Sequence, residues 1–182
     1  MSKPGLRKQF IDFIESQQMF FVATAATDGH VNVSPKGLDS LRILSPERLV
    51  WLNLSGSGNE TAAHVQEVNR ITLMFCAFEG KPLIVSVYGT ATVIHPWDAA
   101  WQEFIDMFPV MAGSRQIFDI EVEFAQASCG SGVPYYEFKG QRGIGELLPF
   151  YDEMGEDGVQ QFWERKNQRS IDGKATKIFA ED

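Results

Sequence analysis

The chain has 182 residues, of which 44% are hydrophobic and 22% are charged, and this fits one globular domain or half of a symmetric dimer. Its 16 basic and 24 acidic residues give a net charge of -8, which argues against nucleic-acid binding. No apolar run reaches membrane-spanning length and the segment from Met1 to Phe10 is too polar for a signal peptide, so we expect a soluble, cytoplasmic protein without membrane contact.

The first part of the chain predicts a helix followed by a β-meander. Apolar side chains from Leu6 to Ile14 fall on one helical face, which predicts an amphipathic helix over residues 5–17. A strong hairpin turn is expected at Asp28-Gly29, and residues 34–37 should interrupt the strand that follows it. The expected strands cover residues 20–25, 31–33, 41–44 and 48–54.

The rest of the chain adds strands and short helices. Gly89 lies inside a long β-prone run and predicts a bulge or a tight bend. The tail from residue 130 is turn-rich, with one short helical piece at Phe162-Trp163. Helices are expected at 58–68 and 97–108, and strands at 70–78, 83–94 and 118–124. Because closure removes exposed edges, we predict a mainly β fold, a barrel of six or more antiparallel strands with short flanking helices.

A loop rich in glycine and hydroxyl groups, residues 55–61, joins the strand ending at Leu54 to the next helix. The N-terminus of a helix exposes unpaired N–H groups and partial positive charge, and glycine lets a phosphate approach the backbone. The same residues also admit a plain structural explanation, because Ser57 and Glu60 have the spacing of a capping box. The loop therefore indicates either a phosphate site or helix capping.

Other chemistry-bearing residues show no familiar arrangement. Cys76 and Cys129 lie far apart in sequence and are expected to be free thiols. The three histidines have no metal-ligand spacing with one another or with the cysteines, so we infer no metal site. No side chain is assigned a catalytic role, because no Ser-His-Asp set, cysteine pair or carboxylate pair is evident.

Several of these segments together resemble the pyridoxamine 5'-phosphate oxidase-like family of FMN-binding split barrels. They are Val31-Asn32-Val33-Ser34-Pro35-Lys36-Gly37, Trp51-Leu52-Asn53-Leu54, Gly56-Ser57-Gly58-Asn59-Glu60-Thr61 and Asn69-Arg70-Ile71-Thr72-Leu73-Met74-Phe75. The likeness covers roughly residues 8 to 130, and the segments at 128–130 and 166–173 look like one uncharacterised branch of the family. We therefore expect a split-barrel domain over residues 1–130 and an extension over 131–182 that packs on it or on a dimer partner.

The resemblance implies a homodimer with FMN between the subunits. It places Val33, Ser34 and Pro35 along the flavin and Lys36 on the phosphate, with Asn53 and the adjoining Leu52 at the ring. The phosphate would also use Ser57, Asn59, Thr61 and helix N–H groups. Members that oxidise pyridoxamine phosphate carry Ser-Arg-Lys where this chain has Asn59-Glu60-Thr61, so two cations are missing, and Glu60 should turn back into the capping box.

The resemblance leaves three functions open. The first is an FMN-dependent oxidoreductase acting on an unknown small substrate, with the flavin supplying the chemistry. The second is a non-catalytic module that holds flavin or heme, since fold does not fix function. The third is a genuine pyridoxamine or pyridoxine 5'-phosphate oxidase, although the usual substrate-binding Arg and His are not recognisable in residues 130–182. In that tail, Trp163 and Arg169 are the residues to test for substrate or flavin contacts.

Overall fold

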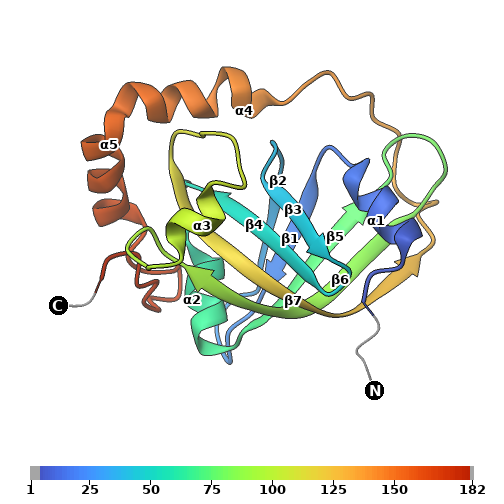
Figure 1. The fold of residues 1–182 in the computed structure, drawn as a ribbon, viewed down its shortest axis with the longest axis horizontal. Helices are drawn as coiled ribbons and strands as arrows, with labels where there is room; N and C mark the ends of the chain where they lie inside the picture. The colour runs from blue at the N-terminus through green and yellow to red at the C-terminus, as the bar shows by residue number, and fades with distance from the viewer. Residues whose placement is uncertain (1–4, 181–182) are drawn as a thin grey trace.

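The computed structural model describes residues 5–180, and its centre is one antiparallel sheet of seven strands (Figure 1). The strands follow one another across the sheet in the order β2-β1-β5-β6-β7-β4-β3. Their bounds are β1 Phe20–Thr24, β2 Asn32–Lys36, β3 Leu41–Ser45, β4 Arg48–Leu54, β5 Arg70–Cys76, β6 Ile84–Ile94 and β7 Ser114–Ser128. The predicted mainly β, antiparallel class is confirmed.

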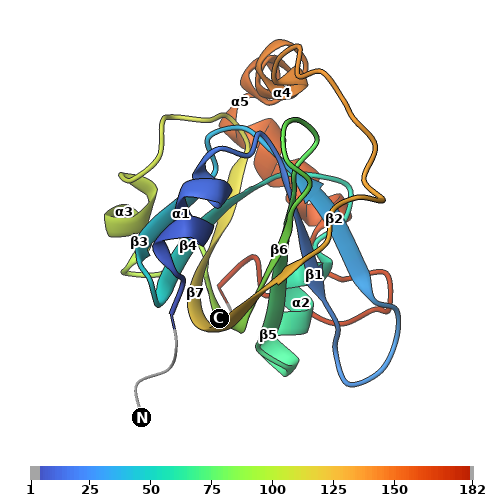
Figure 2. The same cartoon turned by 90° about the vertical axis from the view of Figure 1, so that its right-hand side faces the viewer.

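The sheet curls until its two edges approach each other. Figure 2 shows β1 and β2 on one side of the molecule and β3 and β4 on the other. The ammonium of Lys36 in β2 lies 5.1 Å from the centre of the Trp51 ring in β4, although these strands stand far apart in the strand order. Inside, Trp51 stacks on Phe118 at 4.8 Å between ring centres, and both rings are fully buried. The result is a split barrel around an aromatic and aliphatic core.

Three helices complete the first part of the fold. Helix α1 (Lys8–Glu15) buries Phe10 and Ile14 in the barrel core, as its apolar spacing predicted, although it is shorter than residues 5–17. Helix α2 (Glu60–Glu67) follows the glycine-rich loop and packs against β1 and β6. Helix α3 (Trp101–Ile105) helps to cover the outer face of β4. It occupies only part of the predicted 97–108 segment, because turns replace regular helix on both sides.

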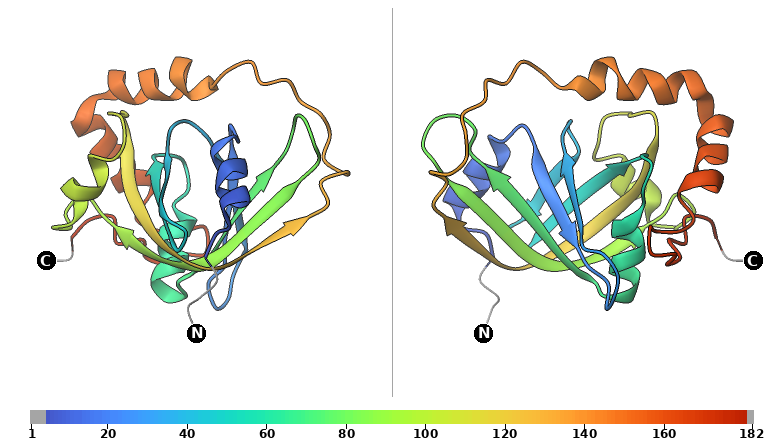
Figure 3. Two further views of the ribbon diagram at one scale, coloured as in Figure 1. Left: turned by 45° about the vertical axis from the view of Figure 1, so that its right-hand side comes forward. Right: turned by 180° about the vertical axis from the view of Figure 1, so that it is seen from behind.

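The C-terminal part differs most from the prediction. Residues 129–141 run as extended chain across the open side of the barrel to α4 (Arg142–Gly145) and α5 (Leu147–Lys166) (Figure 3). A short helical piece near Trp163 was expected, but α5 is 20 residues long. It bends at Gly155, whose φ of 69° interrupts the helix and brings the chain back toward α2 (Figure 1). Within the described chain, no helix is both long and apolar enough to cross a membrane.

Two strand details concern Gly89 and Pro35. The bulge predicted at Gly89 is confirmed, because the register between β6 and β7 shifts between Tyr88 and Gly89. A Cβ there would collide with the carbonyl of Glu121, so only glycine fits. The predicted interruption at residues 34–37 is wrong, since β2 continues through Pro35 to Lys36. A proline is tolerated there because β2 lies at the edge of the sheet.

Candidate anion-binding site

Lys36 is the central cation of the candidate site. It ends β2, and its half-buried ammonium donates a 3.5 Å hydrogen bond to Oδ1 of Asn53 in β4. Burial lowers the pKa of Lys36 from 10.5 to about 8, with a further lowering by Arg115 and a smaller opposing effect of Glu60. Among residues 5–180, no carboxylate forms an ion pair with this lysine. An anion bound beside it would restore the missing opposite charge.

A cleft of about 340 Å³ adjoins this lysine. Of the predicted site residues, Pro35, Lys36, Leu52 and Asn53 line it together. Residues 141–143 and Leu147, at the starts of α4 and α5, form another wall of the cleft. The side chain of Gln141 donates to the carbonyl of Gln18 and accepts from the N–H of Leu38. The cleft is therefore assembled from segments distant in sequence, and the tail is one of its walls.

The alternation of β2 divides the predicted flavin-lining residues between two faces. Ser34 and Lys36 are partly buried on one face, whereas Val33 and Pro35 are exposed on the other. Ser34 donates to Asn32, and the amide of Asn32 donates to the hydroxyl of Thr61 at 3.1 Å. A hydrogen bond therefore links the start of β2 to the first turn of α2.

The loop before α2 does not form the predicted capping box. Asn59 is the N-cap residue and makes no side-chain cap hydrogen bond, while Ser57 is exposed. The Glu60 carboxylate accepts a 3.3 Å hydrogen bond from the N–H of Ile171 in the tail. The prediction failed because a distant part of the chain competes for Glu60.

Arg115, which the sequence reasoning missed, lies beneath the same loop. It is 3% exposed and donates to the carbonyls of Gly58 at 2.9 Å and Gly56 at 3.4 Å. Burial lowers its pKa to about 10, so it stays charged at neutral pH. The sequence carries little sign of this role, because Arg115 precedes the predicted strand at 118–124 and stands between the polar residues Ser114 and Gln116.

The tail packs directly on this loop. Trp163 donates its indole N–H to Ser55 Oγ at 2.7 Å. Asn167 is fully buried, donates to the Gly56 carbonyl and accepts through its own carbonyl from the Asn59 amide. Arg169 instead stays exposed and donates to Gly173 within the tail. Of the two tail residues singled out by sequence, only Trp163 contacts the candidate site.

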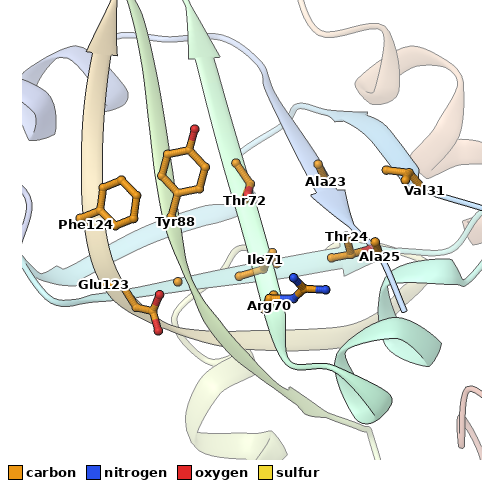
Figure 4. Close-up of a pocket in the computed structure, with 11 residues that line it drawn as sticks. Ala23, Thr24, Ala25, Val31, Arg70, Ile71, Thr72, Tyr88, Glu123 and Phe124 are labelled. Carbon is orange, nitrogen blue, oxygen red and sulfur yellow. The ribbon is translucent and has the colours of Figure 1, made fainter. Parts of the chain in front are cut away.

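A second, apolar hollow of about 400 Å³ lies on the outer face of β1, β5, β6 and β7 (Figure 4). Figure 4 shows Thr72, Tyr88 and Phe124 side by side on neighbouring strands, with Val31 at the far edge. Tyr88 stacks on Phe124 at 4.6 Å, and Phe124 is 45% exposed. The hollow is shallow and its lining has no cluster of cations, so the apolar surface of a partner would fit it better than an anion would.

Comparison with known proteins defines the class to which this barrel belongs. The family profile described as pyridoxamine 5'-phosphate oxidase matches residues 6–129. The chain therefore belongs to the pyridoxamine 5'-phosphate oxidase family. Proteins of this family usually bind a flavin and are often dimers.

Particular relatives agree with this assignment. A pyridoxamine 5'-phosphate oxidase family protein of Aspergillus flavus, UstO, is 38% identical over 128 residues, which are 68% of this chain. The chain spans about half the length of that relative, 51%. HupZ of Group A Streptococcus shares the fold at a TM-score of 0.57 and 20% identity, over 72% of this chain and 99% of its own. A putative pyridoxamine 5'-phosphate oxidase of Lactobacillus delbrueckii shares the fold at a TM-score of 0.54 and 18% identity. The match covers 69% of this chain and 97% of that protein.

Proposed function

We propose that this chain binds FMN through the Lys36 site and serves as a flavin-dependent oxidoreductase for a small organic substrate. The observation that carries the proposal is the half-buried ammonium of Lys36, which forms no ion pair within residues 5–180 and lies on β2, the strand whose Asn32 is hydrogen-bonded to Thr61 in the first turn of α2. A buried cation without a carboxylate is costly unless an anion completes it. Family membership supplies the reason to name that anion as the phosphate of a flavin mononucleotide.

The residues of the site fit such a group in charge and hydrogen bonding. Lys36 offers an ammonium, and Arg115 adds a second positive charge below the loop. The helix N-terminus near Asn59 and Thr61 offers N–H groups for phosphate oxygens. Asn53 and the backbone of residues 33–35 would border the ring, and the flavin, when bound, would supply hydride or electron transfer.

The apolar outer face favours a homodimer as the functional form. Val31, which lines the hollow shown in Figure 4, is 70% exposed, and Val33, two residues further along the chain, is 61% exposed. Exposed apolar surface of this kind is typical of protein contacts. We propose that a second copy covers this face and completes the flavin site, with residues 1–130 as the flavin-binding domain and the segment from 131 as an extension.

The direct test compares FMN with riboflavin, which lacks the phosphate. Wild-type protein and the Lys36→Ala variant are titrated with each flavin, and quenching of flavin fluorescence reports the dissociation constant. We expect Lys36→Ala to weaken FMN binding by about tenfold or more, because a charge-assisted contact to phosphate contributes about 1.5–3 kcal/mol, and to change riboflavin binding little. Lys81→Ala, an exposed lysine between β5 and β6, is the matched control.

The same preparation separates catalysis from storage. An FMN-loaded protein that a reduced nicotinamide nucleotide bleaches, and that regains its colour in air, supports the oxidoreductase. A bound flavin that no reductant changes, or a heme spectrum, supports a non-catalytic module instead. Formation of pyridoxal phosphate from pyridoxamine phosphate would identify a genuine vitamin B6 oxidase. Equal FMN affinity in wild type and Lys36→Ala would remove the proposed phosphate site.

A further inference from the structure

Arg115 is a buried cation with an unmet hydrogen-bonding group. It is the second residue of β7, and its side chain is 3% exposed. One terminal nitrogen of the guanidinium donates to the carbonyls of Gly58 and Gly56. Its Nε is buried and has no hydrogen-bond partner among residues 5–180. Such a group costs free energy unless something compensates it.

No acidic side chain fully compensates this charge. Within residues 5–180, no carboxylate forms an ion pair with Arg115. Glu60 and Tyr151 act on the guanidinium only from a distance, while burial lowers its pKa to about 10. The charge of Arg115 in turn lowers the pKa of Lys36, so two cations repel each other around one loop. Removing a charge from water costs several kcal/mol, and an apolar side chain at position 115 would avoid this cost.

The position of the Arg115 guanidinium suggests what the molecule gains from burying this charge. Arg115 binds the carbonyl oxygens of Gly56 and Gly58, so these two acceptors of the loop are already engaged by a cation. Asn167 of the tail binds the Gly56 carbonyl as well, at 2.9 Å. With these carbonyls engaged, the loop can present its N–H groups to a ligand at the start of α2.

We infer that Arg115 is the second cation of the phosphate site, replacing from beneath the loop the charges that Asn59-Glu60-Thr61 do not provide. The inference rests on the proposed function, because the anion in question is the phosphate of FMN. Arg115 is a positioning residue that acts through the 55–60 loop and through its charge. The positive charges of Arg115 and Lys36 together match a phosphate dianion, whereas Lys36 alone would leave one negative charge unpaired.

A purely structural role makes different predictions. If Arg115 only fastened the loop, its loss would lower the melting temperature of the flavin-free protein and weaken both flavins equally. If it serves the phosphate, its loss weakens FMN binding much more than riboflavin binding, whatever the change in the melting temperature of the flavin-free protein. The decisive quantity is therefore the ratio of the riboflavin and FMN dissociation constants, because riboflavin shares the ring but not the phosphate.

The experiment measures both dissociation constants and the melting temperature for wild type, Arg115→Gln and Arg115→Lys. We expect Arg115→Gln to weaken FMN by about 10- to 100-fold and riboflavin by less than about threefold, while Arg115→Lys retains more of the preference. Glu60→Gln, which removes a nearby negative charge, should strengthen FMN binding. Arg48→Gln, at the opposite end of β4, removes the same charge outside the site and should change neither flavin.

The outcomes separate this inference from the proposed function. Wild-type protein that binds neither flavin would overturn both. Wild-type protein that prefers FMN, with an unchanged preference in Arg115→Gln, would overturn the role of Arg115 alone. If Arg115→Gln does not fold, Arg115→Lys decides, and a preference equal to that of wild type together with a lower melting temperature would assign Arg115 a structural role.

Discussion

Replacing Lys36 with methionine measures the free-energy cost of burying this ammonium in the flavin-free protein. In the unfolded chain the amine keeps its ordinary pKa of 10.5, whereas burial lowers the pKa to about 8 in the folded chain. The unfolded state therefore binds more protons between these values, and the stability of the wild-type protein rises with pH through this window. The methionine variant lacks this contribution.

The pKa shift sets the size of the effect. A difference from 10.5 to about 8 corresponds to about 3 kcal/mol between pH 7 and pH 10.5, at about 1.4 kcal/mol per pKa unit. About 1 kcal/mol of this should appear by about pH 9. Urea unfolding of flavin-free wild type and Lys36→Met at three pH values gives the difference in free energy of unfolding, in which the titration of other groups cancels. A difference that stays constant across the window would refute the reasoning.

Two further predictions concern the fold and the tail. Gly89→Ala should lower the free energy of unfolding by about 2 kcal/mol in urea denaturation, because the new methyl collides with the Glu121 carbonyl at the bulge, and a loss below about 0.5 kcal/mol would contradict that geometry. Asp172→Asn should speed hydrogen exchange in residues 163–176, because the Asp172 carboxylate accepts from the backbone and ring N–H groups of His30 and its pKa is lowered by these bonds. Unchanged exchange there, with the barrel strands as internal reference, would show that other contacts hold the tail.

Much of the barrel follows from local sequence signals. Strand β4 was expected at 48–54 and is Arg48–Leu54, because a continuous apolar run between turns suits a strand buried on both faces. Gly89 indicated the bulge, because glycine in a β-prone run usually marks a close backbone approach. The joint pattern of several weak motifs identified the family, although each motif alone also fits a turn or a capped helix.

The remainder depended on contacts between distant segments. The spacing of Ser57 and Glu60 is local, but Glu60 bonds instead to Ile171, and local sequence contains no sign of that competitor. Helix α5 was underestimated because glycines and a proline interrupt its apolar pattern, while tertiary contacts such as Trp163 with Ser55 fasten it. Arg115 reaches the loop only because β7 pairs with β4 in one particular register. Long-range register cannot be read from either strand alone.

The central claim is that the phosphate of FMN binds between Lys36 and the start of α2. A crystal structure of the protein with FMN tests this most directly. We predict phosphate oxygens within hydrogen-bond distance of Lys36 Nζ and of backbone N–H groups in residues 57–61, with Arg115 still hydrogen-bonded to the carbonyls of Gly56 and Gly58. A flavin bound elsewhere, or a phosphate that contacts neither Lys36 nor this loop, would contradict it.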